Sequence, residues 1–137
     1  MVLHMPTPQA IFVRRAFTPR QEIADAVIVV EDQSIVAVGP RNHVAIPAGA
    51  TRREASSLTI VPGFVDVHIH GAGGRDVMEG APDALAAVTR TVARHGTTSL
   101  LATTVTASEE RTCQAVAGIA AWMRSEPAAR DNRTPQA

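Results

Sequence analysis

The sequence predicts an α/β protein in which a small strand-rich leading segment precedes two strand–helix units. Two observations predict this fold class. Short β-branched runs dominate the part of the chain before residue 62, and two apolar strands then alternate with two helical patterns. Alternation of this kind is typical of βα units on a parallel sheet.

The leading segment contains a predicted β-hairpin. Residues 26–30 and 35–38 are short, apolar and β-branched, and residues 31–34 between them include turn formers. The stretch from Pro40 through "IPAGATRRE" breaks the strand pattern. A third apolar run at residues 58–61 is stopped by the Pro-Gly pair that follows it.

The first strand–helix unit begins with the β-favouring stretch 64–69, whose near-continuous apolar character predicts burial on both faces of a sheet. A glycine-rich loop covers residues 71–80. Pro82 then suits the first turn of a helix whose apolar positions recur at helical spacing, and the helix is expected to end at His95-Gly96 with the glycine as a left-handed cap.

The second unit pairs a predicted buried strand, "TTSLLATTVT" at 97–106, with a helix that runs to about Ser125. Thr106 and Glu109 have the spacing of a capping box, and Pro127 is expected to close the helix before an unstructured end. The inward-facing stripe of this helix is predicted to be Cys113, Val116, Ile119, Ala120 and Met123.

Composition limits the classes of partner and compartment. Thirteen basic and thirteen acidic residues cancel, and aromatic residues make up only 3%, so nothing favours nucleic acid or an anionic membrane as a partner. No apolar run approaches the ~20 residues of a membrane span. The single cysteine, Cys113, fits a reducing compartment, and we expect a cytoplasmic protein.

Two histidines, His68 and His70, are the principal candidates for chemistry. Residues i and i+2 of a strand project from the same face, with Cβ atoms roughly 7 Å apart, so the two imidazoles can converge on a Zn- or Fe-type ion. They stand at the carboxyl end of their strand, where parallel βα folds build active sites. The competing interpretation is two polar residues placed by chance near a loop.

The neighbouring candidates carry less weight. Asp66 is expected on the same face and could orient an imidazole or satisfy a backbone group. The carboxylates of Asp76 and Glu79 are more often solvated than catalytic. "GAGG" resembles a phosphate-cradling loop, but no Lys-Ser/Thr pair follows it as a P-loop requires. His95 is explained by the helix dipole, and Cys113 is interpreted as a small core residue.

These motifs together resemble a known family. "VPGFVDVHIHG" resembles the first-strand motif of the amidohydrolase superfamily, which are metal-dependent hydrolases on a (β/α)8 barrel with an N-terminal β-sandwich segment. "HGAGGRDVMEG" and "HGTTSLLATTVT" are similar to segments of the N-acetylglucosamine-6-phosphate deacetylases. The resemblance covers nearly the whole chain. It implies a β-sandwich segment at 1–61 and the first two βα units of an incomplete TIM-type barrel at 62–137.

The resemblance also implies a function. His68 and His70 would be ligands of a divalent metal of the Zn or Fe type in an enzyme that deacetylates N-acetylglucosamine 6-phosphate. Family members complete the site with a glutamate, two further histidines and a general-base aspartate from later strands, and some replace the first two histidines. None of the later residues is in this sequence, so no catalytic residue is assigned and this chain alone is expected to be inactive. A homo-oligomer is allowed at full length.

Two other functional classes stay open. Dihydroorotase-like and adenine-deaminase-like amidohydrolases share the first-strand motif but usually lack the Gly-x-x-Gly-x-Asp continuation. A stand-alone, non-catalytic metal-binding or interaction module would fold cooperatively by itself, whereas an incomplete barrel would expose apolar strand faces and an unpaired edge.

Overall fold

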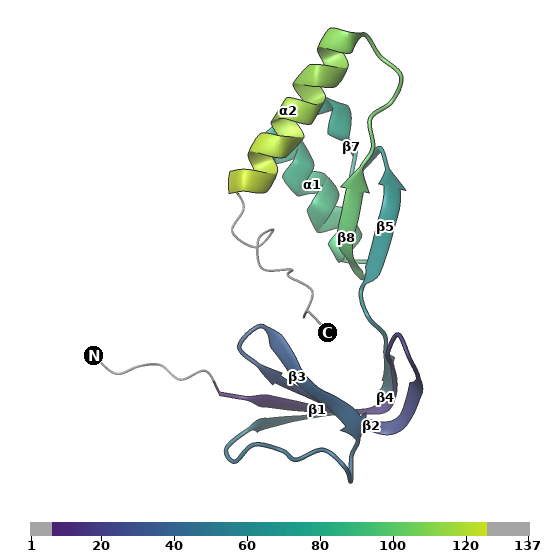
Figure 1. Cartoon of the computed structure of the whole chain (residues 1–137), viewed down its shortest axis with the longest axis vertical. Helices are drawn as coiled ribbons and strands as arrows, with labels where there is room; N and C mark the ends of the chain where they lie inside the picture. The colour runs from purple at the N-terminus through teal and green to yellow at the C-terminus, as the bar shows by residue number, and fades with distance from the viewer. Residues whose placement is uncertain (1–6, 126–137) are drawn as a thin grey trace, which may run out of the picture. The chain divides into compact units, whose positions relative to one another are not determined.

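The computed structural model describes residues 7–125, which form two compact units that divide between Pro62 and Gly63 (Figure 1). The predictions at Pro127 and for the chain end lie outside this range. None of the helices within it has both the length and the apolar character needed to cross a bilayer.

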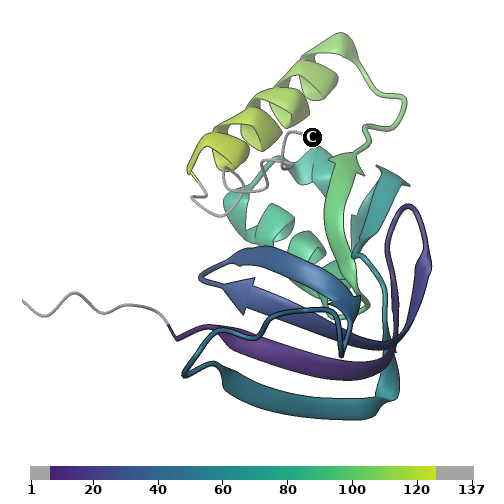
Figure 2. The same cartoon turned by 60° about the horizontal axis from the view of Figure 1, so that its bottom comes forward.

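The first unit is a four-stranded mixed sheet in the order β3-β2-β1-β4 (Figure 2). Antiparallel pairing joins β1 to β2 and β2 to β3, whereas β1 and β4 pair in parallel. The strands are β1 (Gln9–Phe17), β2 (Glu22–Glu31), β3 (Ser34–Pro40) and β4 (Thr51–Ile60).

The predicted hairpin is confirmed. Glu31 pairs with Ser34, so β2 and β3 are joined by the two-residue turn Asp32-Gln33. Asp32 adopts a positive φ of 54°, which aspartate tolerates better than most residues. A tight turn with left-handed geometry matches the right-handed twist of the flanking strands.

Strand β1 and the first part of β4 were missed because their own residues do not show an apolar strand pattern, whereas the predicted run at 58–61 overlaps the end of β4. Strand β1 carries two arginines in its middle, and β4 opens with "TRRE", which is exposed to solvent. These segments become strands because they pair with each other and, for β1, with β2. Sheet pairing here overrides the local signal.

The first unit buries apolar side chains on both faces of its single sheet. One cluster contains Val13, Ala26 and Ile28. On the other face Phe12 is fully buried and is covered by Val44 and by other residues of the β3–β4 connection. Register shifts in the β1–β4 and β2–β3 pairings mark irregularities whose extra residues lie in β4 and β3.

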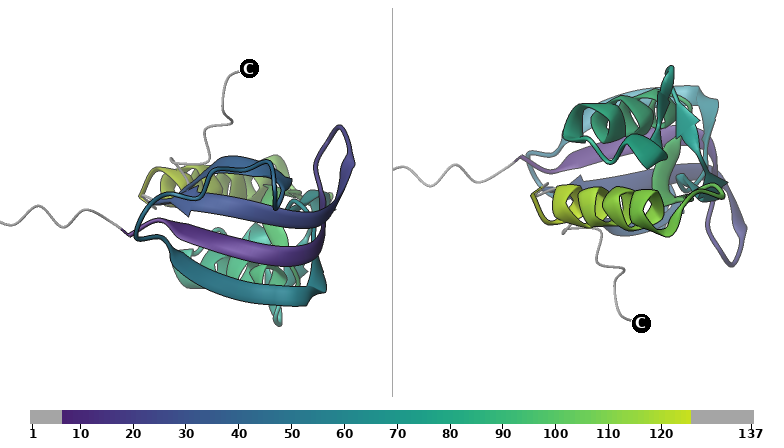
Figure 3. Two further views of the ribbon diagram at one scale, coloured as in Figure 1. Left: turned by 90° about the horizontal axis from the view of Figure 1, so that it is seen from below. Right: turned by 90° about the horizontal axis from the view of Figure 1, so that it is seen from above.

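The second unit contains one parallel strand pair, a miniature hairpin and two helices on the same side of the pair (Figures 1 and 3). Both predicted strands and both predicted helices are present. The elements are β5 (Phe64–Ile69), β6 (Gly71–Ala72), β7 (Arg75–Asp76), the 3-10 turn η1 (Val77–Glu79), α1 (Pro82–Ala93), β8 (Thr97–Ala102) and α2 (Glu109–Ser125).

Helix α1 follows the prediction closely. Proline stands at its first turn, Leu85 and Val88 are buried, and Gly96 has a φ of +91° just after the helix ends. The carbonyl of Gly96 accepts a hydrogen bond from the backbone of Phe64 at 2.9 Å, so the end of α1 also supports the start of β5.

The predicted burial of β5 is wrong for this chain. Val65 and Val67 are 63% and 67% exposed, and Leu101 of β8 is also exposed. Strand β5 pairs only with β8 in the described residues, and both helices lie on one side of that pair. Apolar character alone cannot bury a strand when no neighbouring layer covers it.

Two predictions for α2 also need correction. Its N-cap is Ser108 rather than Thr106, because the Ser108 hydroxyl accepts the backbone N–H of Arg111 at 3.4 Å. Ala115 is the buried position, whereas Cys113, Val116 and Met123 of the predicted stripe are exposed. The helix has apolar residues on more than one side, so periodicity could not indicate which side faces η1 and α1.

Helix α2 packs against η1 through two glycines. A Cβ added to Gly118 would lie 2.2 Å from the carbonyl oxygen of Gly80, which is backbone and cannot rotate away. Gly80 itself has a φ of 61° at the end of η1. The absence of a side chain at both positions therefore permits the close approach of helix and turn.

We predict that Gly118→Ala destabilises the second unit, although alanine is the better helix former by about 1 kcal/mol. The steric conflict with Gly80 should cost about 1–3 kcal/mol net, as overpacking does in other proteins. Chemical denaturation measures the difference. The control Ala117→Gly lies on an exposed position and should cost only about 1 kcal/mol of helix propensity. A stabilised Gly118→Ala protein would contradict this packing.

Candidate functional site

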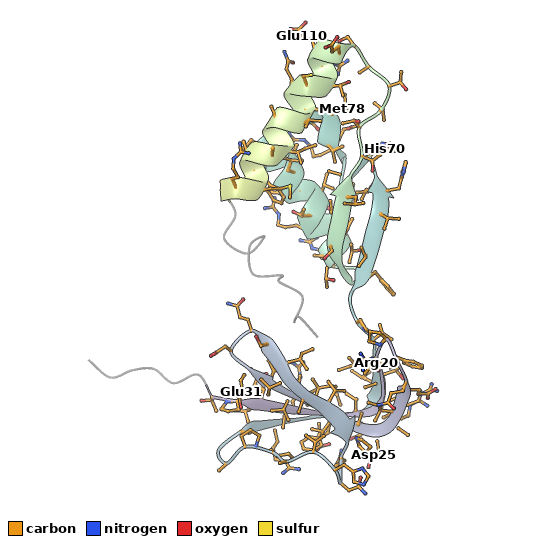
Figure 4. All side chains as sticks on the ribbon, in the orientation of Figure 1. Arg20, Asp25, Glu31, His70, Met78 and Glu110 are labelled. Carbon is orange, nitrogen blue, oxygen red and sulfur yellow. The ribbon has the colours of Figure 1, made fainter. Side chains whose placement is uncertain are left out.

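The candidate site lies at the carboxyl end of β5, where Figure 4 shows His70 at the tip of the strand. The pairing of β5 with β8 shifts register between Asp66 and Ile69, so His68 lies in an irregular part of the ladder. Such an irregularity redirects side chains relative to a regular strand.

The structure brings the two predicted histidines together. The Nε2 atoms of His68 and His70 are 3.1 Å apart, and the rings meet edge to face with centroids 4.8 Å apart. Both side chains are exposed to solvent. The convergence is tighter than the ~7 Å between Cβ atoms on one strand face would require.

A backbone contact settles the proton arrangement on His70. Its Nδ1 lies 2.8 Å from the carbonyl oxygen of Thr103. A carbonyl can only accept a hydrogen bond, so Nδ1 carries the proton and the Nε2 of neutral His70 presents a lone pair. In this state His68 donates its Nε2 proton to His70.

Asp66 satisfies a backbone group rather than an imidazole. Its Oδ1 accepts the backbone N–H of His68 at 3.1 Å. On the other side, the carbonyl of His70 accepts the backbone N–H of Val77, a fully buried residue, at 2.8 Å. The backbone N–H of His68 and the backbone carbonyl of His70 are thus both hydrogen-bonded.

The pair fits two positions of a metal site. Two nitrogen ligands of a tetrahedral ion at 2.0–2.1 Å lie roughly 3.3 Å apart, which is close to the observed 3.1 Å. Imidazole nitrogen suits Zn and Fe, and a metal-binding histidine usually donates its other ring N–H to a carbonyl or carboxylate, as His70 does to Thr103. Across residues 7–125, however, no cluster of three or more histidine, cysteine, aspartate or glutamate side chains could hold an ion.

The glycine-rich loop after His70 is a miniature hairpin instead of a phosphate cradle. Gly71 pairs with Asp76 across it, and Gly73 and Gly74 form its turn with φ values of 62° and 78°. A Cβ on Gly71 would lie 2.2 Å from the carbonyl oxygen of Arg75. The glycines are therefore explained by the close backbone approach.

The two carboxylates of this loop have structural partners. Asp76 caps η1 by accepting the N–H of Met78 at 2.7 Å, and the Glu79 carboxylate accepts the N–H of Asp76 at 2.9 Å. Arg75 donates to Glu79 through its Nε and Nη2 and to Asp83 at 2.9 Å. The carboxylates of Glu79 and Asp83 therefore both form ion pairs with Arg75.

These contacts shift the acidities of the cluster. Hydrogen bonds from Arg75, and then from the Asp76 backbone, lower the pKa of Glu79, and the Arg75 contact lowers the pKa of Asp83. The same partners raise the pKa of Arg75. The cluster of Arg75, Glu79 and Asp83 is therefore charged at neutral pH. The sequence did not predict it, because Arg75 and Asp83 are eight positions apart.

Comparison with known proteins gives consistent matches. The model of the amidohydrolase family matches residues 59–131. The N-acetylgalactosamine-6-phosphate deacetylase of Escherichia coli O157:H7 is 39% identical over 69% of this chain and 23% of its own length. The N-acetylglucosamine-6-phosphate deacetylase of Vibrio furnissii is 33% identical over 78% of this chain and 26% of its own length.

A solved structure is similar as well. The N-acetyl-D-glucosamine-6-phosphate deacetylase of Mycobacterium smegmatis, a mutant in complex with N-acetyl-D-glucosamine-6-phosphate, has a TM-score of 0.76 and 32% identity. The match covers 87% of this chain and 30% of that one. The chain thus spans about a quarter to a third of the length of these relatives.

We predict that Arg75→Gln destabilises the second unit at neutral pH and that its deficit shrinks on acidification. Folded-state pKa values below the ordinary 4.5 of Glu79 and 3.8 of Asp83 contribute stability that is present above those values and is lost as pH falls through the lowered ones. Denaturant titrations of both proteins between neutral pH and about pH 2.5 measure the difference.

The matched control is Arg53→Gln, because Arg53 is an exposed arginine without an ion pair to any residue in 7–125. It should change stability little at any pH. A deficit for Arg75→Gln that stays constant down to the acid limit would contradict the assigned ion pairs.

Proposed function

This chain belongs to the amidohydrolase family, and on that basis we propose that His68 and His70 are two metal ligands of an amide hydrolase. The observation that carries the proposal is the 3.1 Å approach of their Nε2 atoms, with the Nε2 lone pair of His70 left available by its contact with Thr103. A structural pair of surface histidines has no need of this arrangement.

We propose a Zn- or Fe-type divalent ion, which would polarise an amide carbonyl and supply an activated water when bound. The residues of this chain would hold and orient it. Asp66 and Val77 hold the backbone on either side of the histidine pair, and Thr103 orients one ring. Neither carboxylate of the Arg75 cluster is assigned a catalytic role, because both are engaged in ion pairs.

The proposed reaction removes the acetyl group of N-acetylglucosamine 6-phosphate, giving glucosamine 6-phosphate and acetate. The deacetylases from Vibrio furnissii and Mycobacterium smegmatis are named for this substrate, which supports it. The Escherichia coli relative is named for the galacto epimer, so the substrate class is an N-acetylhexosamine 6-phosphate and the gluco epimer is our choice within it.

We further propose that β5, α1, β8 and α2 are the first two βα units of a (β/α)8 barrel, with residues 62–137 as that part and residues 1–61 as the β-sandwich segment. The parallel pairing of β5 with β8 and the helices on one side of them support this assignment. The exposed apolar side chains of Val65, Val67 and Leu101 are what a barrel would cover with further elements.

Catalysis should require ligands beyond the histidine pair. Three protein ligands are typical of catalytic zinc, and two would leave the ion weakly held and largely hydrated. We therefore propose that the 137-residue chain alone does not turn over substrate. A cytoplasmic reaction on a soluble amino sugar phosphate also suits the balanced charge, which attracts neither nucleic acid nor a membrane surface.

We predict that His68→Asn and His70→Asn each weaken binding of Co2+ or Zn2+ to the chain by at least about 100-fold, more than the loss of an outer-shell partner costs. Competition with a chromophoric chelator measures the affinity. His43→Asn and His95→Asn change exposed histidines elsewhere and serve as matched controls. Equal losses in all four variants would contradict a site at the pair.

A chimera tests the reaction itself. Residues 7–125 replace the matching segment of the Vibrio furnissii deacetylase, and metal-dependent acetate release from N-acetylglucosamine 6-phosphate is measured beside N-acetylgalactosamine 6-phosphate and a cyclic ureide. We expect turnover of the acetylated sugar phosphates alone, with the gluco epimer preferred. A folded chimera that acts on the ureide, or on none of the three, would refute the proposed substrate class.

A further inference from the structure

Thr103, the residue immediately after β8, makes four hydrogen bonds at the end of the strand pair. Its backbone N–H donates to the carbonyl of Ile69 at 2.8 Å, and its own carbonyl accepts from Nδ1 of His70 at 2.8 Å. Its hydroxyl accepts the N–H of Ile69 at 3.2 Å and donates to the carbonyl of Leu101 at 3.0 Å. The side chain and main chain of one residue thus hold Ile69, the last residue of β5, and His70, which follows it.

The hydroxyl adds a side-chain hydrogen bond where the strand ladder ends. The β5–β8 register shifts before Ile69, so regular parallel pairing does not carry through the segment that holds His68. The Thr103 Oγ1 accepts the N–H of Ile69, which also pairs with Ala102 in the ladder, and it donates its own proton to the Leu101 carbonyl of β8. Ile69 separates the two histidines, so its placement sets the direction of both side chains.

The backbone carbonyl of Thr103 accepts a hydrogen bond from the imidazole of His70. Because it fixes the proton of His70 on Nδ1, it leaves Nε2 unprotonated and directed toward Nε2 of His68. An ion held by the two histidines would need His68 in the tautomer with its proton on Nδ1, whereas His70 already presents an unprotonated Nε2. No proton has to leave His70.

We propose that Thr103 is a positioning residue for the histidine pair: its hydroxyl anchors the irregular end of β5, and its carbonyl holds His70 in the tautomer that presents Nε2 to a metal. The proposal rests on the proposed function in so far as that metal is concerned. The tautomer of His70 and its dependence on the Thr103 hydroxyl are properties of the metal-free chain.

The test compares Thr103→Val, which removes the hydroxyl at nearly constant volume, with Thr103→Ser, which keeps it. Long-range proton–nitrogen NMR on histidine-labelled chain reports the tautomer at mildly alkaline pH without metal, and the His70→Asn spectrum identifies the signals of His70. Thr89→Val is the matched control, because its hydroxyl also donates to backbone carbonyls but within α1.

We expect a single Nδ1–H tautomer of His70 in the wild-type chain, in Thr103→Ser and in Thr89→Val. Thr103→Val should show a mixture of tautomers and bind Zn2+ about 10–100-fold more weakly, as loss of an outer-shell partner does elsewhere. Circular dichroism verifies that each variant is folded. If the valine variant does not fold, Thr103→Ala removes the same hydroxyl without a branched side chain.

An Nε2–H tautomer of wild-type His70 would overturn the proposal, and so would a Thr103→Val protein with the tautomer and Zn2+ affinity of Thr103→Ser. A wild-type chain that shows the Nδ1–H tautomer, loses it in Thr103→Val and binds no metal at the pair would refute the proposed function. That result would still support the positioning role, so the two failures are distinguishable.

Discussion

The parallel pairing of β5 with β8 is the constraint on which the second unit depends. It holds together segments more than thirty positions apart, since Asp66 pairs with Leu100 and Ile69 with Ala102. Parallel strands require a crossover, and α1 supplies it. The same helix supports the pair at its start, through the hydrogen bond from Phe64 to Gly96. Because His68 lies in β5 and His70 follows it, the pairing of β5 with β8 fixes the position of both histidines.

The chain around the histidine pair is held mainly by backbone groups, and this suits a site that must not move. The N–H of His68 donates to Asp66, the carbonyl of His70 accepts from Val77, and the ring of His70 donates to the Thr103 carbonyl. Each contact fixes a direction as well as a distance. If the pair binds an ion as proposed, restraint of this kind means that it loses little conformational freedom on binding.

The loop at residues 71–80, which follows the histidine pair, is held in a defined conformation by its own contacts. Two glycines with positive φ close the β6–β7 turn, the capping box orders η1, and Arg75 ties Glu79 to Asp83 at the start of α1. Val77, the buried residue of η1, donates its backbone N–H to the carbonyl of His70. Residues that looked like candidates for anion binding or acid–base chemistry therefore stabilise the backbone that carries the histidines.

The exposed apolar side chains of this unit are consistent with a site that needs further protein around it. Val65 and Val67 of β5 and Val116 and Met123 of α2 are all more than half exposed. Soluble proteins rarely leave large apolar patches uncovered without an interaction that uses them. These uncovered faces thus agree with the match to part of larger deacetylases.

The sequence by itself determined the features that depend on neighbouring residues. These are the two strands and two helices of the second unit, the hairpin turn at Asp32, the left-handed Gly96, and the placement of His68 near the end of a strand with His70 directly after it. Local periodicity and turn chemistry are readable along the chain, and the family motif lies in the same short stretch.

Only the tertiary structure decided what depends on distant partners. Strand β4 exists because β1 pairs with it, the buried side of α2 is chosen by Gly80, and Cys113 is exposed since nothing in residues 7–125 covers it. The 3.1 Å approach of the imidazoles and the role of Thr103 arise where β5 meets a residue 33 positions beyond His70. Such contacts have no local signal, because hydrogen bonds between strands join residues that the sequence separates.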